Sequence, residues 1–158
     1  MIEKNILLIK ICNIAIKAGL ETLKYYNEDI QVTHKNDSSP LTKADLASNK
    51  IIIKALQQLD RTIPILSEES LVEWKERKNW TKYWLIDPLD GTKEFIKKNG
   101  EFTVNIALIK NGRPIHGVIY LPTKKENFYT LDKSAYSSMI NIKNQYQSNK
   151  KIKVIVRK

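Results

Sequence analysis

The chain has 158 residues, 42% of them hydrophobic, and its 27 Lys and Arg against 17 Asp and Glu give a formal net charge of +10. This length and composition allow one ordinary domain that buries roughly 70% of the surface of the unfolded chain. The lone Cys12 excludes an internal disulfide, and no apolar run approaches the ~20 residues of a membrane span, so we expect a soluble cytoplasmic protein. The charge favours anionic partners, although an AT-rich coding bias explains it equally well.

Apolar residues recur at spacings of three and four from Ile2 to Tyr26, which predicts an amphipathic helix with Cys12 in the core. The predicted apolar stripe consists of Ile2, Ile6, Ile9, Cys12, Ile16, Leu20 and Leu23. A short strand is predicted over 31–35, followed by turn residues at 36–40. His34 is interpreted as a surface residue of that strand, because no other His or Cys lies near it in the sequence.

A second helix is predicted to start near Thr42 and to reach Leu59, because residues at helical spacing run through this segment. These residues are Leu46, Asn49, Ile53, Leu56 and Leu59. Thr42 fits the N-cap, and Asp45 three residues later fits a capping box with an acid in the first helical turn. From the pattern alone, Asp45 is either a capping residue or a functional carboxylate.

Residues 65–67 predict a short strand that ends at two adjacent acids, Glu68 and Glu69. Alone, such a pair is usually part of a solvated loop. A charged segment at 73–78 is predicted to be a short exposed helix or loop, and the rings of Trp74 and Trp80 are expected to cover the edge of the core.

The stretch from Tyr83 to Ile109 carries the most specific chemistry. Its apolar start predicts a buried strand that Pro88 ends, since proline lacks a backbone donor. Asp87 and Asp90 follow only three positions apart, so one of them would take up a proton unless a cation neutralised the pair. A divalent metal ion is therefore the expected ligand at the end of this strand.

The residues after these acids favour a phosphate site. Gly91 lets the backbone approach a ligand closely, and Thr92 is predicted to be the N-cap of a helix over 93–98. The free N–H groups at the start of a helix attract anions. A hard cation such as Mg²⁺ prefers carboxylate oxygens, so Asp45 and Glu68 become candidate partners in a metal-assisted hydrolysis of a phosphate ester.

Two further strands are predicted over 103–109 and 115–121, joined by a hairpin at the Asn-Gly pair between them. A third strand over 126–131 completes a meander. The resulting domain is expected to span 1–132, followed by a divergent basic tail over 133–158 in which only 151–156 resembles a strand.

The segments LTKAD, SEES and WLIDPLDGT together resemble the lithium-sensitive, Mg²⁺-dependent phosphatases related to inositol monophosphatase. The run DPLDGTKEFIKKNGEFTVNIALI is similar to their bacterial 3'(2'),5'-bisphosphate nucleotidase branch, and the similarity extends from Ile9 to Leu131. The resemblance implies an α+β fold in which two N-terminal helices pack on a mostly antiparallel sheet, the N-terminal domain of a layered αβαβα architecture. It also implies hydrolysis of adenosine 3',5'-bisphosphate to AMP and phosphate in sulfur assimilation.

The resemblance further implies a metal site with two or more Mg²⁺ ions. Glu68, Asp87 and the Leu89 carbonyl would hold one ion, and Asp87 and Asp90 would contribute to another. Glu69 is expected to be a nearby acid rather than a ligand.

The substrate phosphate would bind the backbone N–H groups of Gly91 and Thr92. Asp45 and the Thr92 hydroxyl would position and deprotonate the attacking water. Lys43 lies close to this motif without a defined role.

The sequence departs from the family pattern in its second half. The C-terminal substrate domain is expected to be absent, since no Trp of this chain is followed by Asp as in the family's Trp-Asp motif. Its absence would weaken a second metal site and leave an apolar domain face open to self-association. A truncated, catalytically impaired remnant and an inositol monophosphatase-like activity are the alternatives. No nucleic-acid partner is expected, and association with the cytoplasmic face of the inner membrane is a further expectation.

Overall fold

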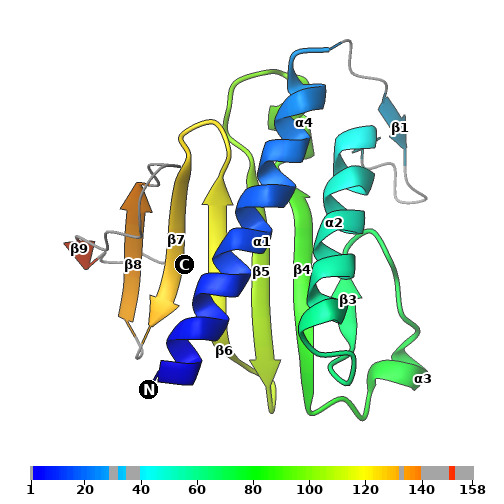
Figure 1. Ribbon diagram of the computed structural model, residues 1–158. Coiled ribbons are helices and arrows are strands. Elements are labelled where there is room, and N and C mark those ends of the chain that lie inside the picture. Colours follow the sequence, from blue (N-terminus) through cyan, green and yellow to red (C-terminus); the bar gives the residue numbers. More distant parts are fainter. Residues whose placement is uncertain (1, 29–31, 35–39, 132–133, 140–149, 152–158) are drawn as a thin grey trace, which may run out of the picture.

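The computed structural model describes residues 2–28, 32–34, 40–131, 134–139 and 150–151. Two long helices, α1 (Ile2–Tyr26) and α2 (Lys43–Leu59), lie side by side on one face of a seven-stranded sheet (Figure 1). The sheet has the order β3-β4-β5-β6-β7-β8-β9, and only the β3–β4 pair is parallel. The predicted α+β fold with a mostly antiparallel sheet is therefore confirmed.

The sheet strands are β3 (Ile65–Ser67), β4 (Lys82–Asp90), β5 (Thr103–Lys110), β6 (Arg113–Leu121), β7 (Glu126–Leu131), β8 (Ser134–Met139) and β9 (Lys150–Lys151). Two short helices, α3 (Trp74–Arg77) and α4 (Thr92–Ile96), lie in the connections on either side of β4. A separate two-stranded ribbon consists of β1 (Val32–His34) and β2 (Pro40–Thr42). No helix in the described part of the chain is both long and apolar enough to cross a membrane.

Helix α1 has the predicted bounds and Cys12 lies in the core as predicted, but three other residues of the predicted apolar stripe are exposed. Ile6, Ile9 and Leu20 are 47%, 44% and 37% exposed. The buried side consists of Leu8, Ile11, Cys12, Ile14, Ala15 and Ala18. Small residues suit this face because they let the helix approach the sheet closely, as at Gly19, where an added Cβ would come within 2.6 Å of the Tyr120 ring.

The central strands alternate between the two faces of the sheet, as half-buried strands do. Trp84 and Ile86 of β4 belong to the core beneath the helices, whereas Leu85 is 41% exposed and, with Asp87, lines a groove on the opposite face. The predicted hairpin between β5 and β6 is confirmed, since Asn111 and Gly112 both have positive φ, 51° and 71°.

Two predictions around the central motif were wrong. Strand β4 does not end at Pro88 but continues to Asp90, because a bulge between Asp87 and Asp90 accommodates the missing donor. Thr92 is the first residue of α4, and its N-cap is Gly91 in the left-handed conformation with φ 91°.

The edges of the structure bring further corrections. Strand β8 was not predicted, although it pairs with all of β7. Trp74 is 64% exposed, with its ring 5.2 Å from the Arg77 guanidinium, so it does not cover the core edge. Of the predicted turn at 36–40, residues 36–39 lie outside the described residues, and Pro40 is instead the first residue of β2. The His34 side chain and the predicted strand beyond residue 151 also lie outside the described residues.

Candidate active site

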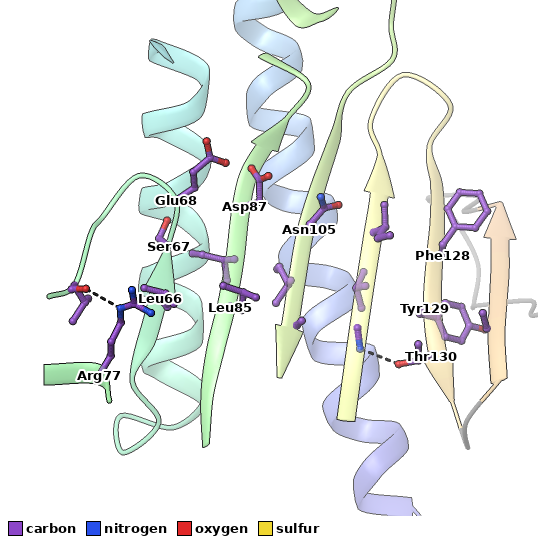
Figure 2. Close-up of a pocket in the computed structure, with 18 of the residues that line it drawn as sticks. Leu66, Ser67, Glu68, Arg77, Leu85, Asp87, Asn105, Phe128, Tyr129 and Thr130 are labelled. Atoms are coloured by element: carbon purple, nitrogen blue, oxygen red, sulfur yellow. Dashed lines mark hydrogen bonds between the residues drawn. The ribbon is translucent and has the colours of Figure 1, made fainter. Parts of the chain in front are cut away.

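Three polar side chains meet where neighbouring strands of the sheet end (Figure 2). Glu68 follows β3 directly, and its N–H donates to the Ile86 carbonyl of β4 at 3.2 Å. The parallel register pairs Ser67 with Ile86, so the next residue on each strand, Glu68 and Asp87, lie beside each other. Asn105 of β5 is the antiparallel partner of Asp87.

The pKa of Asp87 is strongly raised by its surroundings. Its burial, followed by the charges of Glu68 and Asp90, raises its pKa from the ordinary 3.8 to about 7. Its Oδ1 atom is buried and has no hydrogen-bond partner among the residues that the structure describes. A buried carboxylate oxygen without a partner destabilises the structure unless a cation or a proton compensates it.

The bulge of β4 changes the strand register after Asp87 and so the direction of the side chains that follow. It lets Asp90 pair with Thr103 of β5 and brings the Asp90 carboxylate within reach of Asn105, whose Nδ2 donates to Asp90 Oδ2 at 3.1 Å. Thr103 in turn donates to Asn105 Oδ1 at 3.0 Å. The second acid of the motif is therefore oriented by side chains from the next strand.

Asp45 reaches the site from α2, where it caps the helix and also contacts Thr92. It completes the capping box, in which its Oδ2 accepts from the Thr42 N–H at 2.8 Å and from the Thr42 hydroxyl. Its Oδ1 accepts from Thr92 Oγ1 at 3.2 Å. Asp45 is fully buried, and this burial raises its pKa despite the opposing hydrogen bonds from Thr42 and Thr92.

Thr92 links the acidic segments through its position at the start of α4. Besides Asp45, its hydroxyl lies 3.3 Å from the Leu89 carbonyl. Gly91 turns the chain immediately before it in a conformation that side chains rarely adopt. The predicted catalytic pair is thus within hydrogen-bond distance, at the end of the strand that carries Asp87.

The remaining predicted residues are more peripheral. Lys43 is exposed at the first position of α2. Glu69 is half-buried, and its N–H donates to Ser67 Oγ at 3.1 Å.

Sequence reasoning missed the residues that hold the acidic segments. Ser48 donates to the Pro88 carbonyl at 2.7 Å, and Asn49 bonds to Ser67. The sequence did contain a signal for them. Asp45, Ser48 and Asn49 lie at helical spacing on the same buried side of α2 as Ile52, and this side extends towards the site. Asn105 gave a similar signal as a polar residue in an apolar strand.

The carboxylate and carbonyl oxygens of the site are of the kind that a divalent cation such as Mg²⁺ prefers. No group of three or more His, Cys, Asp or Glu among the described residues is arranged to hold an ion. Mg²⁺ does not require such a cage, since it usually binds through one or two carboxylates and keeps several waters. The unpartnered Asp87 oxygen, with Glu68 beside it, fits this mode of binding.

The sequence matches the model of the inositol monophosphatase family over residues 5–157. The chain belongs to this family. It is 48% identical over 147 residues to the 3'(2'),5'-bisphosphate nucleotidase CysQ of Buchnera aphidicola, covering 92% of this chain and 54% of that protein. It is 44% identical over 140 residues to CysQ of Salmonella typhimurium, covering 87% of this chain and 57% of the relative.

Solved structures share the fold. The crystal structure of CysQ from Bacteroides thetaiotaomicron matches with a TM-score of 0.72 and 39% identity, covering 87% of this chain and 51% of the other. The chain therefore spans about half the length of the relatives that it matches.

Proposed function

We propose that the chain is a Mg²⁺-dependent phosphomonoesterase that hydrolyses adenosine 3',5'-bisphosphate to AMP and phosphate. The observation that carries the proposal is the buried, unpartnered oxygen of Asp87, whose carboxyl is raised in pKa to about 7 by its burial and by Glu68 and Asp90. The names of the relatives supply the substrate class, a nucleotide with phosphates on the 3' or 2' and the 5' positions.

In this proposal, Glu68, Asp87 and the Leu89 carbonyl bind one ion, and Asp87 and Asp90 contribute to another. When bound, such ions lower the pKa of a coordinated water and neutralise charge on the phosphate. Asn105 supports this arrangement by orienting Asp90 through its 3.1 Å hydrogen bond.

Asp45 and Thr92 act on the attacking water. The Thr92 hydroxyl donates to Asp45 Oδ1, so its own oxygen is left to accept a hydrogen bond from the water. The raised pKa of Asp45 makes this carboxylate a better proton acceptor than an exposed aspartate. Gly91 and Thr92 offer backbone N–H groups to the substrate phosphate, where the absence of a side chain on Gly91 permits close approach.

The experiment is phosphate release from adenosine 3',5'-bisphosphate in the presence of Mg²⁺, compared between the wild type and Asp87→Asn. The substitution is expected to lower kcat/KM by more than about 100-fold, which exceeds the effect typical of replacing a residue that only orients a metal ligand. Glu76→Gln, which removes an equal charge on the exposed helix α3, is the matched control and should keep full activity. Equal rates for the wild type and Asp87→Asn would refute the proposal, and preferred turnover of inositol phosphate would favour the alternative substrate.

We propose further that two or more ions bind and that lithium inhibits the reaction, in line with the family resemblance. Metal titration by calorimetry measures the stoichiometry, and phosphate release at increasing Li⁺ measures the inhibition. A single ion or lithium-resistant turnover would contradict these two points.

Two surfaces support association with larger partners. The sheet face opposite α1 and α2 carries an apolar groove of about 980 Å³ (Figure 2) and the exposed Leu85 and Ile119, and we propose self-association of the isolated chain there. The exposed Ile6 and Ile9 of α1, together with the net charge of +10, support peripheral binding to anionic membranes. Sedimentation of the protein alone and with anionic vesicles tests both points.

A further inference from the structure

A buried amide joins α2 to the turn that carries Glu68. Asn49 is 8% exposed, and both ends of its side-chain amide are hydrogen-bonded. Its Oδ1 accepts from the Ser67 hydroxyl at 2.8 Å, and its Nδ2 donates to Ser70 Oγ at 3.1 Å. Because these two serines flank the acidic pair, one side chain holds both ends of the turn.

The turn is also held from within and from the sheet. Ser67 is 2% exposed, and its hydroxyl oxygen accepts from the Glu69 N–H at 3.1 Å. The Ser70 N–H donates to the Ser67 carbonyl at 3.3 Å, and the Glu68 N–H donates to Ile86 of β4 at 3.2 Å. The Glu68 backbone is thus fixed between β4 on one side and Asn49 on the other.

An amide is well suited to position 49. Asn offers an acceptor and a donor on the same planar group, so it satisfies Ser67 and Ser70 at once. An apolar side chain would leave the buried Ser67 hydroxyl without this partner and release the turn from α2. Asp45 lies four residues before Asn49, on the same side of the helix, so movement of the turn changes the position of Glu68 relative to Asp45.

We propose that Asn49 is a positioning residue that sets the place of Glu68 in the metal site and thereby raises the affinity for divalent cations. This inference rests on the proposed function, because it takes Glu68 as a ligand. Residues that orient metal ligands through hydrogen bonds typically change metal affinity by about 10–100-fold when they are removed. Asn49→Ala should therefore weaken metal binding without direct loss of a ligand.

The experiment measures Mn²⁺ affinity from the electron paramagnetic resonance signal of free Mn²⁺, which needs no turnover. Asn49→Ala is expected to bind about 10–100-fold more weakly than the wild type. Ile52→Val is the matched control, since Ile52 is fully buried one turn further along α2 and its aliphatic side chain cannot hydrogen-bond to the turn. It removes one buried methyl group and is expected to leave the Mn²⁺ affinity at the wild-type value.

A milder variant keeps the test valid if Asn49→Ala does not fold. Ser70→Ala, at an exposed residue, removes the bond from Asn49 Nδ2, the one side-chain hydrogen bond of Ser70 within the described part of the chain. It should weaken binding by about three- to tenfold, the effect of one net hydrogen bond. The inference is overturned if Asn49→Ala, or Ser70→Ala in its place, binds Mn²⁺ as tightly as Ile52→Val. If the wild type binds no better than Asp87→Asn, the proposed metal site fails and the role of Asn49 fails with it.

Discussion

Replacement of Gly91 by alanine tests whether the turn between the acidic motif and α4 requires glycine. Gly91 has φ 91°, and a Cβ built there would lie 2.8 Å from the Glu101 carbonyl oxygen and 3.4 Å from Phe102 Cα. Both neighbours are backbone atoms, so neither can rotate away. Gly112 is the matched control, since its φ is 71° and, apart from its two chain neighbours, no described residue has a heavy atom within 4 Å of a Cβ built there.

The two substitutions share the conformational penalty and differ in the contact. The left-handed conformation costs an alanine about 1–2 kcal/mol. At Gly91 the contact with backbone adds about 1–3 kcal/mol of overpacking, so Gly91→Ala should destabilise by about 2–5 kcal/mol. The loss of unfolded-state entropy on changing Gly to Ala is the same at both sites and cancels in the comparison.

Urea unfolding followed by circular dichroism measures both free energies. The loss in free energy of unfolding should be about 1–3 kcal/mol larger for Gly91→Ala than for Gly112→Ala, which is the contribution of the contact alone. Equal losses would show that the chain after Asp90 relaxes freely, which contradicts a rigid turn at the proposed phosphate site.

Three further predictions concern buried polar groups. Asn127 is fully buried with no hydrogen-bond partner for either amide atom among the described residues, so Asn127→Leu should raise the free energy of unfolding by about 1–3 kcal/mol in urea melts; a loss would mean that the amide is satisfied. Thr42→Ala should cost about 1–2 kcal/mol and raise the pKa of Asp45 further in an NMR titration, since the hydrogen bond from the Thr42 hydroxyl that lowers it is lost while the bond from the backbone N–H remains; an unchanged pKa contradicts this. In metal-free protein the folded Asp87 keeps its proton up to pH about 7, whereas the unfolded Asp87 releases it near pH 3.8. The free energy of unfolding should therefore fall as the pH rises from 3.8 to about 7, and Asp87→Asn should make this pH dependence shallower. An identical slope in wild type and variant would refute the pKa assignment.

The fold could be predicted wherever the pattern is local. The hairpin at Asn111 follows from two turn residues, and the helix over 2–26 follows from its apolar spacing. The buried face of that helix could not be predicted, because its small residues give a weaker apolar signal than Ile6 and Ile9, and packing against the sheet favours the small residues. Strand β8 was missed because its pairing with β7, rather than its composition, makes it a strand.

The candidate site, like the fold, could be predicted where its residues form a local motif and could not where they depend on tertiary packing. Asp87 and Asp90 stand in one short motif, so the sequence alone pointed to a cation there. The interpretation of Pro88 as a strand end failed because the bulge, a feature of strand pairing, tolerates proline within β4. The tertiary hydrogen bonds from Ser48 and Asn49 depend on how α2 lies against β3 and β4, which no local pattern specifies.

The proposed metal site depends most on the crowding of Asp87 by Glu68 and Asp90, because either a proton or a cation can then neutralise the Asp87 carboxylate. Calorimetric titration of Mg²⁺ at pH 6.5, in buffers of different ionisation enthalpy, counts the protons released on binding. Because the pKa of Asp87 lies at about 7, the wild type should release a substantial fraction of one proton per bound ion, and Asp87→Asn should release none. Binding of Mg²⁺ to the wild type without proton release, or no binding at all, would contradict the account.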